Sequence, residues 1–300
     1  MSDPIISNTE LLKNKALTVR LSRKKPNRNA LDKAMSTELQ ELKGITDKTA
    51  LRVNKSLFPR EASQVYQDVI TEAGKYFYKN TTPWDDKGWR LLSIEMYKDF
   101  TKTMKGYTRR FREAAQGFID QVDANIEKMK PVLEKAFNIE DYHKFVSATT
   151  GLVDTERVSD MFSLEVEYGT VADGDDLRAS LTEDDREVIS AHITKKNNEK
   201  FAKSQEHIAQ SLLDHVAKIH ERLSDKDNTF RDSLIKNLND LCDLVPRMNI
   251  ADDEDLNQMA AEAKRKLCHW KPSEIRDSTS IRSDVANEAE TLLTNMKGLV

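Results

Sequence analysis

Glycine and proline are scarce in this sequence, with 9 and 7 among 300 residues, whereas average proteins contain about 7% glycine and about 5% proline. Because both residues interrupt helices, their scarcity favours long helices. Only 38% of the residues are hydrophobic, while 33% are charged. This balance favours elongated helical hairpins, each burying one apolar stripe, over a single compact globule.

Long hydrophobic runs are also missing, because nowhere do about 18 consecutive apolar residues occur. The first fifteen residues lack the basic stretch and apolar run that are typical of a secretory signal. The two cysteines, Cys242 and Cys268, belong to no paired motif, and we expect both to be reduced, half-buried helix residues. These absences predict a protein of the host-cell cytoplasm with no membrane partner.

Motifs for several chemistries do not occur. No GxGxxG is present, and the one GxxxxG, from Gly169 to Gly174, is followed by two aspartates, which would repel phosphate. No two histidines are four residues apart, and the single Glu-x-x-His, Glu140 to His143, lacks the second copy that a di-iron site needs. No nucleophile elbow appears. We therefore expect no cofactor, no metal and no enzymatic activity.

The apolar residues recur at spacings of three and four over most of the chain, which predicts amphipathic helices. Thr182 is the expected N-cap of a helix of some forty residues. Gly44 costs a helix only about 1 kcal/mol relative to alanine, so the helix that contains it is expected to continue. The predicted helices cover residues 31–57, 59–79, 94–137 with a kink at Pro131, 141–148, 155–161, 182–223, 230–245, 253–270 and 281–296.

Two short segments alternate apolar and polar residues, as half-buried strands do. They are residues 17–21 and residues 162–168, in which Tyr168 is expected to point inward. If the two strands pair, Arg20 can face Glu165 and Glu167 across the ladder. The predicted fold is therefore mainly α, with long amphipathic helices in coiled-coil-like hairpins and a small two-stranded antiparallel β element. The expected domains are residues 1–175 and 176–300, or one continuous elongated domain.

Charge is distributed unevenly although the net charge is only −4. Thirteen basic and four acidic residues lie between Lys13 and Arg60, so this segment carries +9 and the rest of the chain −13. Such asymmetry indicates a polyanionic partner or self-assembly, or it belongs to a solvated helix surface. The basic run that follows the first strand, expected to be a loop, consists of Arg23, Lys24, Lys25 and Arg28.

A second basic feature is a stripe at helical spacing, interleaved with aromatic residues such as Phe100 and Phe111. Basic stripes with aromatics occur in channels for single-stranded nucleic acids, where cations contact phosphates and rings stack under bases. The same rings also fall on the apolar face that the helix needs for packing. The candidate binding residues are Lys102, Lys105, Arg109, Arg110 and Arg112.

The segment from Trp84 to Trp89 contains two adjacent acids, Asp85 and Asp86, between indole rings. Acids flanked by indoles can bind a cation or a sugar. The alternative is a turn, in which Pro83 sets the entry, the indoles pack on the core and the acids cap the next element.

This segment resembles a domain-of-unknown-function family encoded by tailed phages and prophages. The resemblance rests on a K-x-L helix and a T-x-P-W-x-D-x-G-x-R-L-L turn that leads into a tyrosine-containing helix. The matching residues are Lys55, Leu57, Thr81, Pro83, Trp84, Asp86, Gly88, Arg90, Leu91, Leu92 and Tyr97. The resemblance implies a phage protein encoded beside a MoxR-type AAA+ ATPase and a von Willebrand-type protein, and so an accessory role in a remodelling complex.

Two hypotheses follow. The first is a non-enzymatic helical interaction protein that forms homo-oligomers and acts as a subunit or adaptor of a complex with other phage proteins, including an AAA+ ATPase. The alternative is a protein that binds DNA or RNA in phage recombination or replication, motivated by the basic segment and by Arg109 and Arg110.

Overall fold

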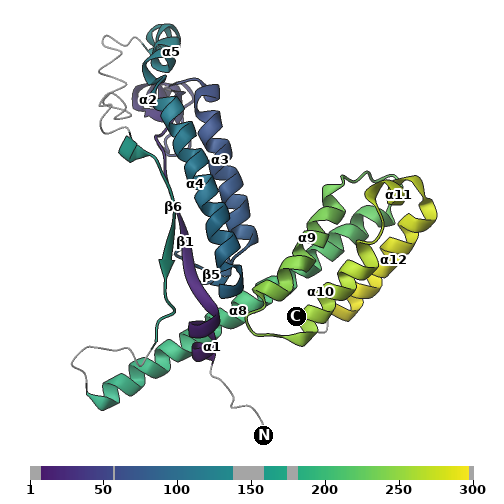
Figure 1. The fold of residues 1–300 in the computed structure, drawn as a ribbon. Helices are drawn as coiled ribbons and strands as arrows, with labels where there is room; N and C mark the ends of the chain where they lie inside the picture. Colours follow the sequence, from purple (N-terminus) through teal and green to yellow (C-terminus); the bar gives the residue numbers. More distant parts are fainter. Residues whose placement is uncertain (1–7, 57, 138–158, 174–181, 297–300) are drawn as a thin grey trace. The chain divides into compact units, whose positions relative to one another are not determined.

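The computed structural model describes residues 8–56, 58–137, 159–173 and 182–296 (Figure 1). The chain forms two compact units, each built from separated segments. Unit 1 comprises Met1–Arg20, Phe77–Thr101 and Glu167–Val300, and unit 2 comprises Leu21–Tyr76 and Lys102–Val166. The expected domain boundary near residue 175 stays a prediction about separately folding parts.

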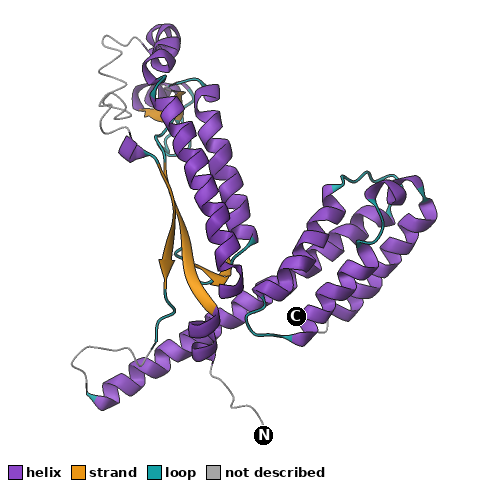
Figure 2. Ribbon diagram, in the orientation of Figure 1, coloured by secondary structure: helices purple, strands orange, loops and turns teal. Residues whose placement is uncertain are grey.

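Unit 1 contains a helical bundle around one very long helix, as Figure 2 shows. The hydroxyl of Thr182 accepts a hydrogen bond from the Asp185 amide at 3.2 Å and so caps the long helix, as expected. Apolar residues at spacings of three and four, from Phe201 to Leu223, are buried along one face. The helices of the bundle are α8 (Glu183–Ser224), α9 (Ser233–Met248), α10 (Glu254–Leu267), α11 (Pro272–Asp277) and α12 (Thr279–Met296).

A second layer of unit 1 contains α1 (Asn8–Lys15), β4 (Thr82–Pro83), β5 (Arg90–Ser93) and the 3₁₀ turn η1 (Ile94–Met96). Its core is a cluster that includes Leu12 of α1, Trp84, Leu91 of β5 and Phe201 of α8. The bundle and the strand layer of unit 1 therefore share helix α8.

Unit 2 has an aromatic core. Tyr66 and Phe118 are in edge contact with ring centroids 5.4 Å apart, and Phe58 lies 5.0 Å from Phe118. Phe162 lies 5.3 Å from Tyr66 and 5.8 Å from Phe118. These rings come from segments far apart in the sequence, and Phe58, Tyr66 and Phe118 are among the buried side chains of the unit. The elements that begin or lie in unit 2 are β2 (Asn29–Asp32), α2 (Lys33–Leu42), β3 (Val53–Ser56), α3 (Arg60–Lys79), α5 (Val122–Phe137), the 3₁₀ turn η2 (Ser159–Met161) and β6 (Ser163–Gly169).

The β structure is larger than expected. A four-stranded sheet has the order β4-β5-β1-β6, where β1 is Ala16–Lys24 and β6 is Ser163–Gly169, and β2 and β3 form a separate antiparallel pair. The expected neighbours β1 and β6 do lie side by side. Arg20 Nη2 is 2.5 Å from Glu167 Oε2, which confirms the cross-strand pair. The two-stranded prediction was wrong because residues 90–93 also pair with β1, antiparallel, and residues 82–83 pair with them in turn.

Gly44 ends a helix that was expected to continue. The residue has φ of 64°, and its amide donates to the Glu41 carbonyl at 3.1 Å, while the Ile45 amide donates to the Gln40 carbonyl at 2.8 Å. These two bonds form a Schellman motif, in which the left-handed glycine satisfies the last carbonyls of the helix. The prediction treated Gly44 only as a propensity cost. The structure uses its conformational freedom to turn the chain toward β3.

Other expectations need smaller corrections. The expected helix 94–137 is interrupted after α4 (Tyr97–Ile119) by a turn at Asp120, and Pro131 lies within the second helix, α5. Residues 194–200 of α8 are continuous helix, where Asn197 is buried and donates to the Ala172 carbonyl at 2.8 Å. The expected helix 141–148 and most of 155–161 lie outside the described residues.

Candidate functional site

The Trp84–Trp89 segment is a hydrogen-bonded turn between β4 and β5. The amides of Trp84 and Asp85 donate to the Trp89 carbonyl at 3.0 and 3.2 Å. The Asp85 carboxylate accepts from the amides of Lys87 at 2.9 Å and Trp89 at 3.0 Å. Gly88 adopts a φ of 87°, a backbone conformation that residues other than glycine rarely adopt. Oδ1 of Asp85 therefore serves the turn itself.

Arg90, the last charged residue of the resembling turn, is held inside unit 1. Its guanidinium donates to Thr81 Oγ1 at 2.7 Å and to the Thr81 carbonyl at 2.5 Å, and lies 5.1 Å from the ring centroid of Tyr78. Burial lowers the pKa of Arg90 from its ordinary value. The side chain thus fixes the end of α3 to β5, which explains its place in the motif without a ligand.

Lys55, at the start of the same resemblance, has a comparable role in unit 2. Its ammonium lies 2.9 Å from Asp32 Oδ2, and both side chains are largely buried. Asp32 also caps α2 by accepting from the Met35 amide at 3.0 Å. Burial opposes the ionisation of Asp32, but the Met35 amide and Lys55 together hold its pKa below the ordinary value.

Three lysines of α8 form a pocket with the turn, all within unit 1. The pocket has a volume of about 300 Å³ and contains Trp84, Asp86 and Lys200, whose ammonium lies 5.1 Å from an indole ring centroid of Trp84. Lys196, also in the lining, pairs with Glu199 at 2.8 Å. Cations and carboxylates are mixed here, so the pocket has no preference for one sign of ligand charge.

The basic run of unit 2 lies along α3. Arg23 and Lys24 are the exposed end of strand β1 rather than the expected loop. Lys25 Nζ donates to Gln67 of α3 at 3.2 Å, and Arg28 Nε donates to the Phe58 carbonyl at 3.2 Å. Arg23, Lys24 and Lys25 remain exposed, while Arg28 is half-buried.

The basic stripe of unit 2 lies on the solvent face of α4. Lys102, Lys105, Arg109 and Arg112 are all exposed. Their spacings of three and four place them on one side of the helix. Arg109 Nε lies 3.8 Å from Glu113, a weak surface contact.

The aromatic residues and the remaining arginine of this segment point elsewhere. Phe100 and Phe111 are buried, so neither ring is available to stack on a base. Arg110 faces α3, where its guanidinium lies 2.9 Å from Glu72. Arg23 lies against Gly74, which is about 200° around α3 from Glu72. The basic run and Arg110 therefore lie on different sides of α3 and do not form one patch.

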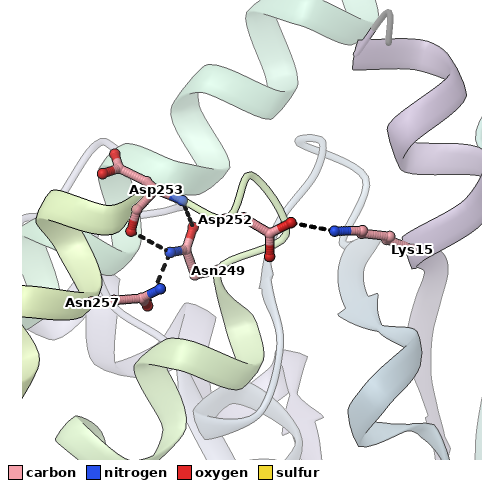
Figure 3. Close-up of polar contacts among 5 residues, drawn as sticks. All are labelled: Lys15, Asn249, Asp252, Asp253 and Asn257. Carbon is pink, nitrogen blue, oxygen red and sulfur yellow. Dashed lines mark hydrogen bonds and ion pairs between the residues drawn. The ribbon is translucent and has the colours of Figure 1, made fainter. Parts of the chain in front are cut away.

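The turn between α9 and α10 carries a polar cluster that sequence reasoning missed (Figure 3). Asn249 is buried, and its amide nitrogen donates to the Asp253 carbonyl at 2.8 Å and to Asn257 Oδ1 at 3.0 Å. The Asp253 amide donates to Asn249 Oδ1 at 3.1 Å. Asp252 has φ of 54° and pairs with Lys15 of α1. Because both ends of the Asn249 amide are used, this cluster stabilises the turn and offers no ligand site.

An exposed aromatic patch of unit 1 was also missed. Tyr168 was expected to point inward, but 46% of it is exposed. Its ring lies edge-on to Tyr97 with centroids 6.1 Å apart, and its hydroxyl is 3.4 Å from Thr101 Oγ1. Ile94, one turn before Tyr97, is also exposed. We call Ile94, Tyr97 and Tyr168 the tyrosine patch. Nothing in the sequence linked Tyr97, expected in a helix, to Tyr168, expected in a strand.

Metal-binding clusters and reactive thiols are two features that could carry catalysis. The described residues contain no group of three or more His, Cys, Asp or Glu side chains that could hold a metal ion. The cysteines are free; Cys242 is buried rather than half-buried. Burial raises the pKa of Cys242 to about 12 and that of Cys268 to about 11, so both thiols are protonated at neutral pH.

Comparison with known proteins gives no relative: no family model matches the chain, and no curated protein or solved structure matches it. Within the described part of the chain, no helix combines the length and the apolar character needed to cross a membrane.

Proposed function

We propose that the protein is a non-enzymatic helical interaction protein, a phage-encoded subunit or adaptor that self-associates and works with an AAA+ ATPase. The observation that supports an interaction role is the tyrosine patch. The phage origin and the ATPase partner are supported by the family resemblance at Thr81–Leu92.

The tyrosine patch is more than scattered surface apolarity. Nine large hydrophobic side chains of the described residues are exposed. Two of them, Tyr97 (37% exposed) and Tyr168 (46%), are in ring contact, and Ile94 (45%) lies three residues before Tyr97. Isolated exposed apolar residues are normal, whereas a contiguous group indicates a contact surface. Tyrosine is enriched among the residues that dominate binding energy, because it buries a large area with little loss of rotamer freedom. The patch therefore favours a protein partner, and we propose a second copy of this chain.

The test is the double variant Tyr97→Ser, Tyr168→Ser, with Val188→Ser as a matched control, since Val188 is an isolated residue that is 69% exposed. Size-exclusion chromatography with light scattering should show a wild-type mass above that of one chain and a monomeric double variant. We expect the control to behave as the wild type. A wild type that is monomeric at every concentration, and that retains no ATPase in a nuclease-treated pull-down from infected cells, would refute the proposal.

A second candidate function, nucleic-acid binding, is supported by the exposed stripe on α4. Unit 2 carries 21 basic and 18 acidic residues, a net charge of +3, whereas unit 1 carries −7. Phe100 and Phe111 are buried, so this candidate rests on phosphate contacts of the stripe and not on base stacking by those two rings. Binding through it would be insensitive to sequence and would weaken steeply with salt.

Charge reversal of the stripe tests this candidate. The variant Lys102→Glu, Lys105→Glu, Arg112→Glu should lose affinity for a single-stranded oligonucleotide, and its salt dependence should become shallower by about one unit of slope for each phosphate that the variant no longer neutralises. The control Lys33→Glu, Lys43→Glu changes two exposed lysines in the same unit, at the first residue and at the C-cap of α2. Equal affinities of the three proteins would exclude this site, and the same measurement with Arg23, Lys24 and Lys25 reversed would test the basic run.

A further inference from the structure

An open pocket of about 430 Å³ lies where α8 ends and α9 begins, within unit 1. Its lining includes Lys218 and Arg222 of α8, which are one turn apart, and Phe230, Arg231 and Ser233 from the segment that follows. No carboxylate is among the described residues that line this pocket. Every charged group that faces it is therefore a cation.

The charge of this pocket differs from that of its surroundings. Unit 1 as a whole carries −7. The α8 pocket beside Trp84 includes Asp85, Asp86 and Glu199, and a third pocket, beside α10, includes three carboxylates. In the part of the chain that the structure describes, Lys218, Arg222 and Arg231 enter no ion pair. The pocket is thus a local concentration of unneutralised positive charge in an acidic unit.

The aromatic wall of the pocket, Phe230, is held in place by its neighbours. Phe230 is only 8% exposed, and the guanidinium carbons of Arg276 and Arg282 lie 5.4 and 5.9 Å from its ring centroid. The neighbouring carboxylate, Asp232, is paired with Arg276 at 2.7 Å and so is not available to neutralise the pocket. A wall fixed before binding reduces the entropy lost when a ligand is ordered.

We propose that this pocket binds a small phosphorylated molecule. Lys218, Arg222 and Arg231 would hold the phosphoryl group, because arginine forks match its oxygens and a lysine ammonium adds a compact charge. The hydroxyl of Ser233, which makes no hydrogen bond among the described residues, adds a donor. The volume exceeds what one phosphate fills and lies in the range of small-molecule sites, so the body of the ligand rests against Phe230.

The site shares no residue with the tyrosine patch or the α4 stripe, so it stands or falls separately from the proposed function. The experiment is isothermal titration of the full chain with three probes: adenosine monophosphate, inorganic phosphate and adenosine. We expect the monophosphate to bind and adenosine not to bind. Binding of inorganic phosphate as tight as that of the monophosphate assigns the affinity to the phosphoryl group alone, and weaker binding assigns part of it to the apolar wall.

The variant Lys218→Gln, Arg222→Gln, Arg231→Gln removes the three charges, and the Arg222 carbonyl used by Arg282 is unaffected. We expect its affinity for the monophosphate to fall by more than about tenfold. The control Lys226→Gln, Lys236→Gln removes exposed cations that do not line the pocket. No binding by the wild type, tight binding of adenosine, or equal weakening in the control would each overturn the proposal. Circular dichroism checks folding, and the single variant Lys218→Gln replaces the triple one if that fails to fold.

Discussion

Arg282 of α12 closes the C-terminal end of α8, and its removal should loosen that end. The residue is 8% exposed, and its guanidinium donates to the carbonyls of Arg222 at 2.8 Å, Leu223 at 3.1 Å, Asp225 at 2.5 Å and Asn228 at 2.7 Å. The last carbonyls of a helix have no partner within the helix. One side chain thus satisfies the end of α8 and the loop that follows it.

The magnitude follows from these contacts. Arg282→Met keeps the aliphatic stem and removes all four bonds, each worth about 1.5–3 kcal/mol net for a charged donor. Two effects reduce this loss in the variant. Water can replace the guanidinium at the carbonyls of Asp225 and Asn228, which lie in a loop near the surface, and the variant no longer carries the cost of burying a charge. We expect the local free energy of opening to fall by about 3 kcal/mol, in the upper range for single substitutions. Arg282→Lys should lose about half as much, since one ammonium cannot reach four acceptors.

The assay is native-state hydrogen exchange at the amides of Val216–Leu223, which reports opening of this segment without unfolding the whole chain. The control is Arg222→Met, because the Arg222 side chain is exposed and only its backbone carbonyl contacts Arg282. Protection in the control should change by less than about 0.5 kcal/mol. If Arg282→Met also stays within that limit, the guanidinium does not hold the end of α8 and the reasoning is wrong.

Three further predictions concern buried polar groups. The Tyr66 hydroxyl is buried without a hydrogen-bond partner among the described residues, and burial raises its pKa to about 12. Tyr66→Phe should therefore leave the melting temperature unchanged or higher near pH 8. The wild type should lose stability as pH rises from about 10 to about 12, and the variant should lack this loss. A lower melting temperature of the variant near pH 8 would show that the hydroxyl has a hydrogen-bond partner. Asp32→Asn should cost about 2–3 kcal/mol in thermal denaturation, since it removes the carboxylate from a largely buried ion pair with Lys55. Because the pKa of Asp32 is lowered, this stability is present above about pH 4 and lost as pH falls through the folded pKa, so the variant should show a flatter acid limb. Arg90→Lys should cost about 1–2 kcal/mol, because a lysine cannot donate to both oxygens of Thr81; an unchanged melting temperature would contradict this role.

Local patterns in the sequence were enough for much of the fold. The N-cap at Thr182 and a helix of some forty residues follow from a capping residue and from apolar spacing, and both depend only on neighbours in the chain. The pairing of Arg20 with Glu167 followed from alternation in two strands. The helix end at Gly44 was missed, although glycine is the residue that most readily adopts the left-handed conformation of a C-cap.

The strand pairing beyond β1 and β6 was not predictable. Residues 90–93 form β5, yet Leu91 and Leu92 precede a helix and show no alternation long enough to indicate a strand. What makes them a strand is the neighbouring edge of β1 and the hydrogen-bonded turn at Trp84–Trp89. Propensity is a weak guide where a partner strand supplies the hydrogen bonds.

The candidate sites, like the fold, were predictable in part. The relative placement of the cations of α4 follows from the sequence, because helical spacing puts them on one face. The burial of Phe111, the contact of Tyr97 with Tyr168, and the shared pocket of Lys218 and Arg231 became visible only in the folded chain. Helix periodicity acts over a few residues, whereas burial and pockets depend on which distant segments pack together, and that depends on the total apolar surface and hydrogen bonding of the chain.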